Sequence, residues 1–268
     1  MPRVKIIAEI GENHIGDMDI AKRLIREAAE AGADYVKFQS YRPENFSTDD
    51  PEYEWFKKVS LSDGAHSMLK RYAEECGIEF TSSPFSVERA EFLCGELGLK
   101  EIKIASGVML NFPILNYINS RVDTVFLSTG MATLDEIRDA LAHIKDVPNV
   151  YLLHCVAQYP CEDKEANLKA ISILKNRFPA CGIGYSDHTI GTDACLMAAA
   201  LGAQVIEKHF TFDKNAKEGT DHILSLEPAE LKALVKSVRR AESLLGKDAK
   251  EPTPGEERIK EFVRSRFL

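Results

Sequence analysis

Short apolar runs alternate with longer amphipathic segments along almost the whole chain. The short runs are rich in β-branched and aromatic residues and predict strands, whereas the longer segments repeat their apolar residues with a helical period. The predicted strands span residues 4–11, 35–40, 79–85, 101–107, 124–130, 150–155, 181–187 and 204–210. The predicted helices span residues 19–32, 64–77, 86–98, 112–120, 133–145, 167–178, 193–202 and 227–246. Gly32 and Gly77 at two of the helix ends fit a left-handed C-cap and support these boundaries.

The regular alternation of strand and helix indicates the fold class. Eight strand–helix units within residues 1–250 predict a single (β/α)₈ TIM-barrel domain. An open doubly wound sheet is the alternative, but such sheets usually carry a glycine fingerprint after the first strand, and the sequence EIGENHIG lacks it. Residues 251–268 contain Pro252 and Pro254 near their start, and we expect them to form a C-terminal tail outside the barrel.

Composition and charge narrow the class of protein. The chain has 268 residues, of which 44% are hydrophobic and 28% charged, as in an ordinary soluble globular protein. Its net charge of −8 argues against a general nucleic-acid binder, and no apolar run is long enough to span a membrane. The six cysteines form no CxxC pair, and the N-terminus has no signal-peptide pattern. We therefore expect reduced thiols and a cytoplasmic location.

Polar residues stand at the C-terminal ends of nearly all the predicted strands, where the active site of a barrel lies. Lys37 and Gln39 alternate on one strand and therefore share a face, and Lys103 lies within another strand. A barrel has no exposed edge, so both lysines need a charged partner, either a side chain or a bound anion. Serine hydroxyls lie at the ends of four strands, at Ser83, Ser106, Ser128 and Ser186. Together these groups predict a site for phosphate and carboxylate groups.

Two histidines at the ends of neighbouring predicted strands suggest a metal site. His188 shares a face with Ser186, and His209 shares a face with Glu207. Adjacent strands lie about 4.8 Å apart, so the two imidazoles can share one ion. Imidazole suits Mn²⁺, Fe²⁺, Co²⁺ or Zn²⁺. Two protein ligands leave positions open for water and substrate, as in a Lewis-acid catalyst.

Eight sequence motifs, one for each predicted strand, resemble those of the N-acetylneuraminate (sialic acid) synthase family. They occur in the order AEIGENHIGD, YVKFQSY, FTSSPFS, IKIASG, FLSTGMAT, LLHCVAQYP, GYSDHT and IEKHFT. The resemblance covers residues 4 to about 250, and SDHT followed by EKHFT is its most specific part. It implies a (β/α)₈ barrel, in agreement with the strand count.

The resemblance also implies a reaction and a cofactor. Members of the family are transferases that condense phosphoenolpyruvate with an aldose, typically N-acetylmannosamine or a related sugar. The products are a nonulosonic, sialic-acid-like keto acid and phosphate. A divalent metal is required, most often Mn²⁺, with Mg²⁺ or Co²⁺ as alternatives. The partners are then small molecules and a second copy of the chain in a homodimer, with no role for nucleic acid or membrane.

Carried over position by position, the resemblance assigns roles to particular residues. The metal ligands would be His188 and His209, and Glu9 would move a proton. Lys37 and Lys103 would offset the charge of phosphoenolpyruvate, and the rest of its site would comprise Ser83, Ser106, Ser128 and Ser186. The sugar would meet Glu9, Gln39, Tyr159 and Asp221.

The chain departs from the family pattern near the expected sugar site. Val108 stands where many members have an acidic residue, and Val156 and Ala157 replace a more polar pair. The antifreeze-like domain that usually follows the barrel, and whose arginine grips the N-acyl group of the sugar, is expected to be absent. These departures suggest altered acceptor choice, such as a sugar without an N-acyl group, or a separate lid protein acting in trans.

Two other functions fit parts of the pattern. A metal-dependent TIM-barrel hydrolase would share the barrel and the metal, but it usually needs a further carboxylate ligand and an HxH motif on the first strand, which EIGENH does not supply. A catalytically impaired barrel that depends on a partner lid protein would have no reason to keep two lysines and two histidines in its interior. The synthase is therefore the preferred hypothesis.

Overall fold

Eight parallel strands form one curved sheet in the computed structural model, which describes residues 3–219, 221–247 and 249–267. The strands are β1 (Lys5–Gly11), β2 (Tyr35–Ser40), β3 (Glu79–Pro84), β4 (Glu101–Ile104), β5 (Thr124–Ser128), β6 (Asn149–Cys155), β7 (Gly182–Asp187) and β8 (Val205–His209). Their order in the sheet is β3-β2-β1-β8-β7-β6-β5-β4. The two outer strands meet where Thr81 Oγ1 of β3 donates a hydrogen bond to the Glu101 carbonyl oxygen of β4 at 2.9 Å. The sheet is thus a nearly closed barrel, so the predicted (β/α)₈ class is confirmed and the open-sheet alternative is wrong.

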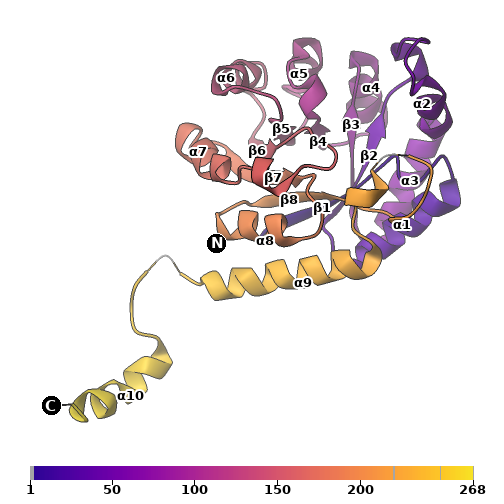
Figure 1. Cartoon of the computed structure of the whole chain (residues 1–268). Coiled ribbons are helices and arrows are strands. Elements are labelled where there is room, and N and C mark those ends of the chain that lie inside the picture. Colours follow the sequence, from indigo (N-terminus) through magenta and orange to yellow (C-terminus); the bar gives the residue numbers. More distant parts are fainter. Residues whose placement is uncertain (1–2, 220, 248, 268) are drawn as a thin grey trace.

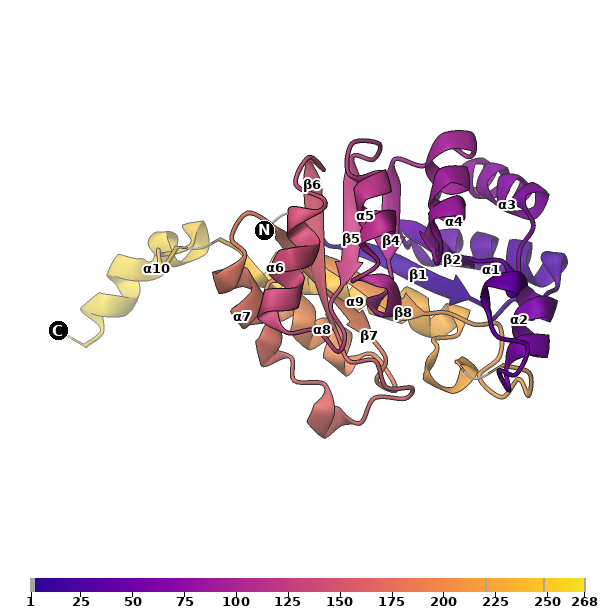
Figure 2. The same cartoon turned by 90° about the horizontal axis from the view of Figure 1, so that it is seen from above.

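Helices follow the strands, and all of the described helices except the last lie around the barrel (Figures 1 and 2). They are α1 (Met18–Ala31), α2 (Tyr53–Val59), α3 (Asp63–Cys76), α4 (Val87–Glu91), α5 (Phe112–Ile118), α6 (Leu134–Ala142), α7 (Lys169–Arg177), α8 (Asp193–Ala200), α9 (Pro228–Leu245) and α10 (Pro254–Ser265). Asp17 begins α1 by accepting hydrogen bonds from the backbone N–H groups of Asp19 and Ile20. Gly32 ends α1 with a φ of 87°, in the left-handed region that the sequence predicted for this C-cap.

Two helical segments differ from the sequence prediction. The segment 86–98 is α-helical only from Val87 to Glu91 and then widens into a π-helical turn over Phe92–Glu96. Helix α2 lies in the long connection between β2 and α3, and the sequence did not reveal it because its seven residues mix aromatic and charged side chains without a helical period. This addition matters for the site, since Trp55 and Phe56 of α2 line the cavity of the barrel.

An apolar layer and a charged layer of side chains lie one above the other in the interior of the barrel. The layer nearer the start of the strands is apolar and consists of Ile7, Tyr35, Phe126, Leu153 and Val205. Two residues further along β1 and β2 the inward side chains are charged, namely Glu9 and Lys37. Strand β7 has a glycine in the apolar layer because a Cβ on Gly184 would lie 2.3 Å from Leu153 Cδ2 and 2.7 Å from the Val205 carbonyl oxygen. The tightly filled apolar layer therefore forms a floor beneath the charged residues.

Helix α10 stands apart from the barrel in both whole-chain views (Figures 1 and 2). A capping box begins it, because Thr253 and Glu256 bond to each other's backbone N–H groups. None of its residues is buried. It lies within the predicted tail, and the outermost residues of the predicted barrel and tail, 1–2 and 268, lie outside the described residues. Among the described helices, none combines the length and the apolar character that a membrane span requires.

Candidate active site

All twelve residues that the sequence assigned to the site line one cavity of about 570 Å³ at the C-terminal ends of the strands. They are Glu9, Lys37, Gln39, Ser83, Lys103, Ser106, Ser128, Tyr159, Ser186, His188, His209 and Asp221. They meet because the parallel strands of a barrel all end at the same face, so inward side chains near those ends converge. The structure brings the whole set together, and the individual roles of its members stay predictions.

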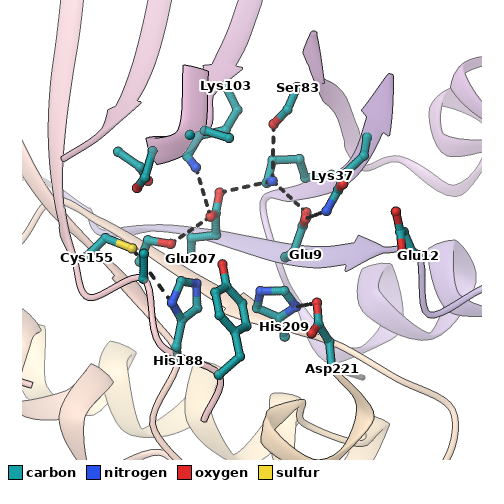
Figure 3. Close-up of a pocket in the computed structure, with 18 of the residues that line it drawn as sticks. Glu9, Glu12, Lys37, Ser83, Lys103, Cys155, His188, Glu207, His209 and Asp221 are labelled. Atoms are coloured by element: carbon teal, nitrogen blue, oxygen red, sulfur yellow. Dashed lines mark hydrogen bonds and ion pairs between the residues drawn. The ribbon is translucent and has the colours of Figure 1, made fainter. Parts of the chain in front are cut away.

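Four buried charged side chains form a chain of ion pairs at the bottom of the cavity (Figure 3). Lys37 Nζ lies 2.8 Å from Glu9 Oε2 and 3.8 Å from Glu207 Oε2. Lys103 Nζ lies 3.2 Å from Glu207 Oε1. None of the four residues is more than 3% exposed. The two buried lysines thus have the charged partners that the sequence predicted, and the four formal charges cancel.

Burial and the ion pairs set the protonation of these groups. Burial alone would raise the pKa of Glu207, but Lys103 and Lys37 lower it to about 2, so this carboxylate is ionised. Burial raises the pKa of Glu9 above its usual range, and the Lys37 ammonium offsets this only in part. Burial also lowers the pKa of Lys103, against the opposing effect of Glu207. Glu9 is therefore the carboxyl group better suited to take up and release a proton.

His188 and His209 lie side by side at the ends of β7 and β8. Their ring centroids are 5.4 Å apart and their planes make an angle of 65°. His188 Nδ1–H donates a hydrogen bond to the Val156 carbonyl oxygen at 2.6 Å, which leaves Nε2 with a free lone pair. His209 Nδ1 is buried without a hydrogen bond, 3.5 Å from Asp221 Oδ2. Burial lowers the pKa of His188 to about 4 and that of His209 to about 3, so both rings are neutral at pH 7.

These two imidazoles fit a divalent metal ion. Neutral imidazole is the form that binds a metal, and a buried ring nitrogen without a hydrogen bond, such as His209 Nδ1, is a group that an ion would satisfy. In the part of the chain that the structure describes, no cluster of three or more histidine, cysteine or carboxylate side chains is arranged to hold a metal. Two histidines alone would leave several coordination positions for water or substrate oxygen atoms. Metal binding itself stays a prediction.

Serine hydroxyls surround the buried lysines. Lys37 Nζ donates a hydrogen bond to Ser83 Oγ at 3.3 Å. Ser186 Oγ donates to Glu207 Oε1 at 2.9 Å. Ser128 Oγ is buried and has no hydrogen-bond partner within the described residues. Ammonium and hydroxyl groups placed together in this way suit the oxygen atoms of a phosphate or carboxylate group.

Tyr159 and Asp221 stand beside the two histidines. The ring centroid of Tyr159, in the connection after β6, lies 4.0 Å from that of His188 and 5.7 Å from that of His209. About half of Tyr159 is exposed, so its ring separates the histidines from solvent on that side. Asp221, in the connection after β8, approaches His209. Both residues therefore lie beside the two histidines in the cavity, and their contact with a sugar stays a prediction.

A second buried ion pair supports the histidines from the outer face of the same two strands. Lys208 Nζ lies 2.9 Å from Asp187 Oδ2, and both side chains are fully buried. Asp187 Oδ1 accepts hydrogen bonds from the backbone N–H and the hydroxyl of Thr189, both at 2.8 Å. Lys208 Nζ also donates to the Thr189 carbonyl oxygen. Because Asp187 and Lys208 adjoin His188 and His209 in the sequence, this network fixes the backbone that carries both imidazoles.

Among the described residues, the lining residues of the cavity that the sequence prediction of the site did not include number eleven, and Glu207, Glu12 and Trp55 are three of them. Glu207 had a usable signal, because it alternates with His209 on β8 and so shares its inward face. Glu12 and Trp55 had none, because they enter the site from the connection after β1 and from α2. Such side chains reach the cavity through tertiary folding rather than through strand periodicity.

Two residues that depart from the family pattern, Ala157 and Val108, differ in their position relative to the cavity. Ala157 lines the cavity, so it lies near the expected sugar position. Val108 is not among the residues that line the cavity, and instead it packs partly buried against the hydrophobic core. Val108 ends the 3₁₀ turn Ser106–Val108, whose first two residues line the cavity, so its place near the sugar stays a prediction.

A (β/α)₈ barrel whose strand ends converge with buried charges and neutral histidines on one cavity has the architecture of a barrel enzyme. The chain belongs to the NeuB family, which it matches over residues 24–250. Two similar proteins bear the names N,N'-diacetyllegionaminic acid synthase and N-acetylneuraminate-9-phosphate synthase. The resemblance seen in the strand motifs is thereby confirmed.

Similarity to individual relatives extends over almost the whole chain. The N,N'-diacetyllegionaminic acid synthase of Campylobacter jejuni is 42% identical over an alignment of 287 residues, gaps included. The alignment covers 100% of this chain and 85% of that protein. The N-acetylneuraminate-9-phosphate synthase of Homo sapiens is 40% identical over 266 residues, with coverages of 94% and 74%. The crystal structure of N-acetylneuraminic acid (sialic acid) synthetase from Leptospira borgpetersenii, in complex with citrate, is 37% identical with a TM-score of 0.92, covering 99% of this chain and 93% of that one.

Proposed function

We propose that this protein is a carbon–carbon bond-forming transferase that joins phosphoenolpyruvate to an aldose, giving a nonulosonic acid and phosphate. The observation that carries the proposal is the pair Lys37 and Lys103, buried on the floor of a barrel beside two neutral histidines. Relatives that align with nearly all of the chain are named as synthases of such acids. Together these features favour the family reaction over other barrel chemistry.

The floor of the cavity offers the donors that phosphoenolpyruvate needs. The phosphate and carboxylate groups of phosphoenolpyruvate would bind Lys37 and Lys103. They would replace part of the ion pairing that these lysines have with Glu9 and Glu207. The hydroxyls of Ser83, Ser106, Ser128 and Ser186 would donate to the remaining oxygen atoms. The four charged side chains are almost fully buried, so each charged contact on this floor is stronger than at the surface.

In the proposed reaction, C3 of phosphoenolpyruvate attacks the aldehyde carbon, water adds at C2, and phosphate leaves with cleavage of its C–O bond. A divalent metal held by His188 and His209, which we take to be Mn²⁺ with Mg²⁺ or Co²⁺ as alternatives, would supply a Lewis acid for the aldehyde oxygen. Lys37 and Lys103 would stay close to the anionic oxygen atoms throughout. Glu9, whose pKa is raised by burial, is suited to carry a proton. The sugar would be bound by Gln39, Tyr159 and Asp221.

The proposal is tested by phosphate release from phosphoenolpyruvate in the presence of Mn²⁺ and a panel of aldoses and aldose phosphates. We expect release only when phosphoenolpyruvate and a suitable acceptor are both present, together with a keto-acid product detected by mass spectrometry. Phosphoenolpyruvate should also raise the unfolding temperature, an effect that a hydrolase would not show. No release with any acceptor would overturn the proposal.

Replacing Lys37 or Lys103 with methionine should raise KM for phosphoenolpyruvate. Methionine keeps most of the stem volume but removes the charge, which should weaken binding by about 2–4 kcal/mol, or roughly 30- to 800-fold. Steady-state phosphate release measures this change. Lys164→Met is the matched control, because Lys164 is 73% exposed at its side chain and lies outside the cavity. An unchanged KM in both cavity variants would mean that phosphoenolpyruvate does not bind at Lys37 and Lys103.

We place the enzyme in the cytoplasm as a homodimer. All six cysteines are free thiols, as suits a reducing compartment.

Helix α8 exposes Leu196 and Met197 to solvent, and Ile190 before it is also exposed, so this side of the barrel has an apolar face suited to a second copy. Sedimentation velocity of the purified protein should show a dimer, and a monomer at micromolar concentration would contradict this part of the proposal.

A further inference from the structure

Glu12 lines the cavity but has no part in the reaction proposed above. It lies in the connection after β1, and Figure 3 shows it at the opposite end of the site from Lys103 and Cys155. Glu12 Oε1 accepts a hydrogen bond from the Tyr41 hydroxyl at 2.6 Å, and Oε2 accepts one from Trp55 Nε1 at 2.6 Å. Two aromatic donors therefore fix the position and orientation of this carboxylate.

The wall around Glu12 is itself anchored. Trp55 belongs to α2, and its ring lies so close to the connection after β8 that a Cβ on Gly219 would be 3.0 Å from Trp55 Cζ2. Lys58 of α2 also forms an ion pair with Glu218 of the same connection. Helix α2, Glu52 directly before it, and the described parts of the connections after β1 and β8 thus form one wall of the cavity. Its acidic members are Glu12, Glu52 and Asp221.

The charges that line the cavity are unevenly divided between floor and wall. Lys37 and Lys103 are the only lysine or arginine side chains among the described residues that line it. Both lie on the floor, in contact with buried carboxylates. The wall carries Glu12, Glu52 and Asp221 instead, and both hydrogen-bond donors to Glu12 are neutral. An anionic group on the floor is therefore matched by lysines, whereas an anionic group at the wall meets like charge.

The fixed carboxylate of Glu12 still has hydrogen-bonding capacity toward the cavity. Each oxygen atom uses one lone pair on its aromatic donor and can accept a further hydrogen bond. Sugar hydroxyl and amide N–H groups can donate such bonds, but a phosphate group brings further negative charge.

We propose that Glu12 determines the specificity for the acceptor. Its carboxylate accepts hydrogen bonds from hydroxyl or amide groups of an unphosphorylated aldose and excludes aldose phosphates. This inference rests on the proposed condensation and names the class of sugar that the same site takes.

The test compares kcat/KM for N-acetylmannosamine and mannose with the values for their 6-phosphates. It is run at pH 8, because burial raises the pKa of Glu12 and the test needs the ionised carboxyl group. The unaltered protein should prefer the unphosphorylated sugar by about tenfold or more, because a like-charge contact in a cavity opposes binding by at least that factor. In Glu12→Gln, the amide can accept from Trp55 and donate to the Tyr41 hydroxyl, so the wall should keep its shape. In this variant, the ratio of kcat/KM for the unphosphorylated sugar to kcat/KM for its 6-phosphate should fall by about tenfold. KM for phosphoenolpyruvate should not change. Glu54→Gln on α2, where the side chain is 83% exposed, is the matched control and should leave the preference unchanged.

The outcomes separate this inference from the proposed function. An unchanged preference in Glu12→Gln, or a preference of the unaltered protein for a 6-phosphate, would overturn the role of Glu12 while the condensation stands. Failure of every acceptor to release phosphate would overturn the condensation and this inference with it. If Glu12→Gln does not fold, the role of Glu12 is tested by measuring the preference of the unaltered protein at increasing salt concentration. The preference must then weaken as ionic strength screens the carboxylate, and a preference independent of salt would refute the role of Glu12.

Discussion

His209→Ala is expected to abolish tight Mn²⁺ binding and to lower the rate of phosphate release by more than about a hundredfold. Loss of a group that merely orients a metal ligand already costs about 10- to 100-fold, and loss of the ligand itself should exceed this. The barrel should still fold, because the smaller side chain removes a buried imidazole whose Nδ1 makes no hydrogen bond. Calorimetric titration with Mn²⁺ and steady-state phosphate release measure the two effects separately.

His154 provides the control for that experiment. It also stands near the end of a strand, β6, and is buried, but its Nε2 donates to the Ala166 carbonyl oxygen at 2.8 Å and it does not line the cavity. His154→Ala should therefore retain Mn²⁺ binding even if it lowers stability. Full activity of His209→Ala in buffer that contains a chelator would show that no metal at this position takes part.

Lys208→Met is expected to destabilise the folded protein by about 3–5 kcal/mol, since it leaves the buried Asp187 carboxylate without its cation. Burial alone would raise the pKa of Asp187, but Lys208 holds it below the usual range. Without Lys208 the folded-state pKa should rise above the unfolded value. The destabilisation should then be complete at neutral pH and should shrink as pH falls through that raised pKa. Urea unfolding at pH 7 and at pH 5 measures both effects.

A double variant distinguishes loss of the charge partner from loss of packing. Adding Asp187→Asn to Lys208→Met removes the uncompensated charge, so part of the lost stability should return. The hydroxyl and N–H of Thr189 can still donate to the asparagine oxygen in place of the carboxylate. A cost below about 1 kcal/mol for Lys208→Met alone would mean that the ion pair contributes little.

Much of the fold could be predicted because parallel strands covered on both faces appear as short apolar runs bounded by turns. The predicted strand at residues 35–40 coincides with β2, and the predicted start of β7 differs by one residue. Helix α2 could not be predicted in this way. Its seven residues are held in place by tertiary contacts, such as the hydrogen bond from Trp55 to Glu12, and not by a periodic apolar face.

The same distinction applies to the candidate site. Side chains that alternate along a strand must share a face, so Lys37 with Gln39, and Ser186 with His188, could be placed in the barrel from sequence alone. Partners on different strands could not be paired, and neither Glu207 as the partner of both lysines nor Glu12 in the wall was identified. The pair Asp187 and Lys208 was hidden for a further reason, since the outer face of a barrel strand is normally apolar.

Strands β7 and β8 place groups for chemistry and for stability on adjacent residues. His188 and His209 line the cavity, whereas Asp187 and Lys208 lie on the opposite face of the sheet. Inserting or deleting a single residue in either strand would exchange those faces, turning an imidazole toward the helices and a charged side chain toward the cavity. Strands β7 and β8 can therefore accept substitutions, but not insertions or deletions, without losing this arrangement. Engineers who seek a different acceptor should confine insertions and deletions to the connections after the strands.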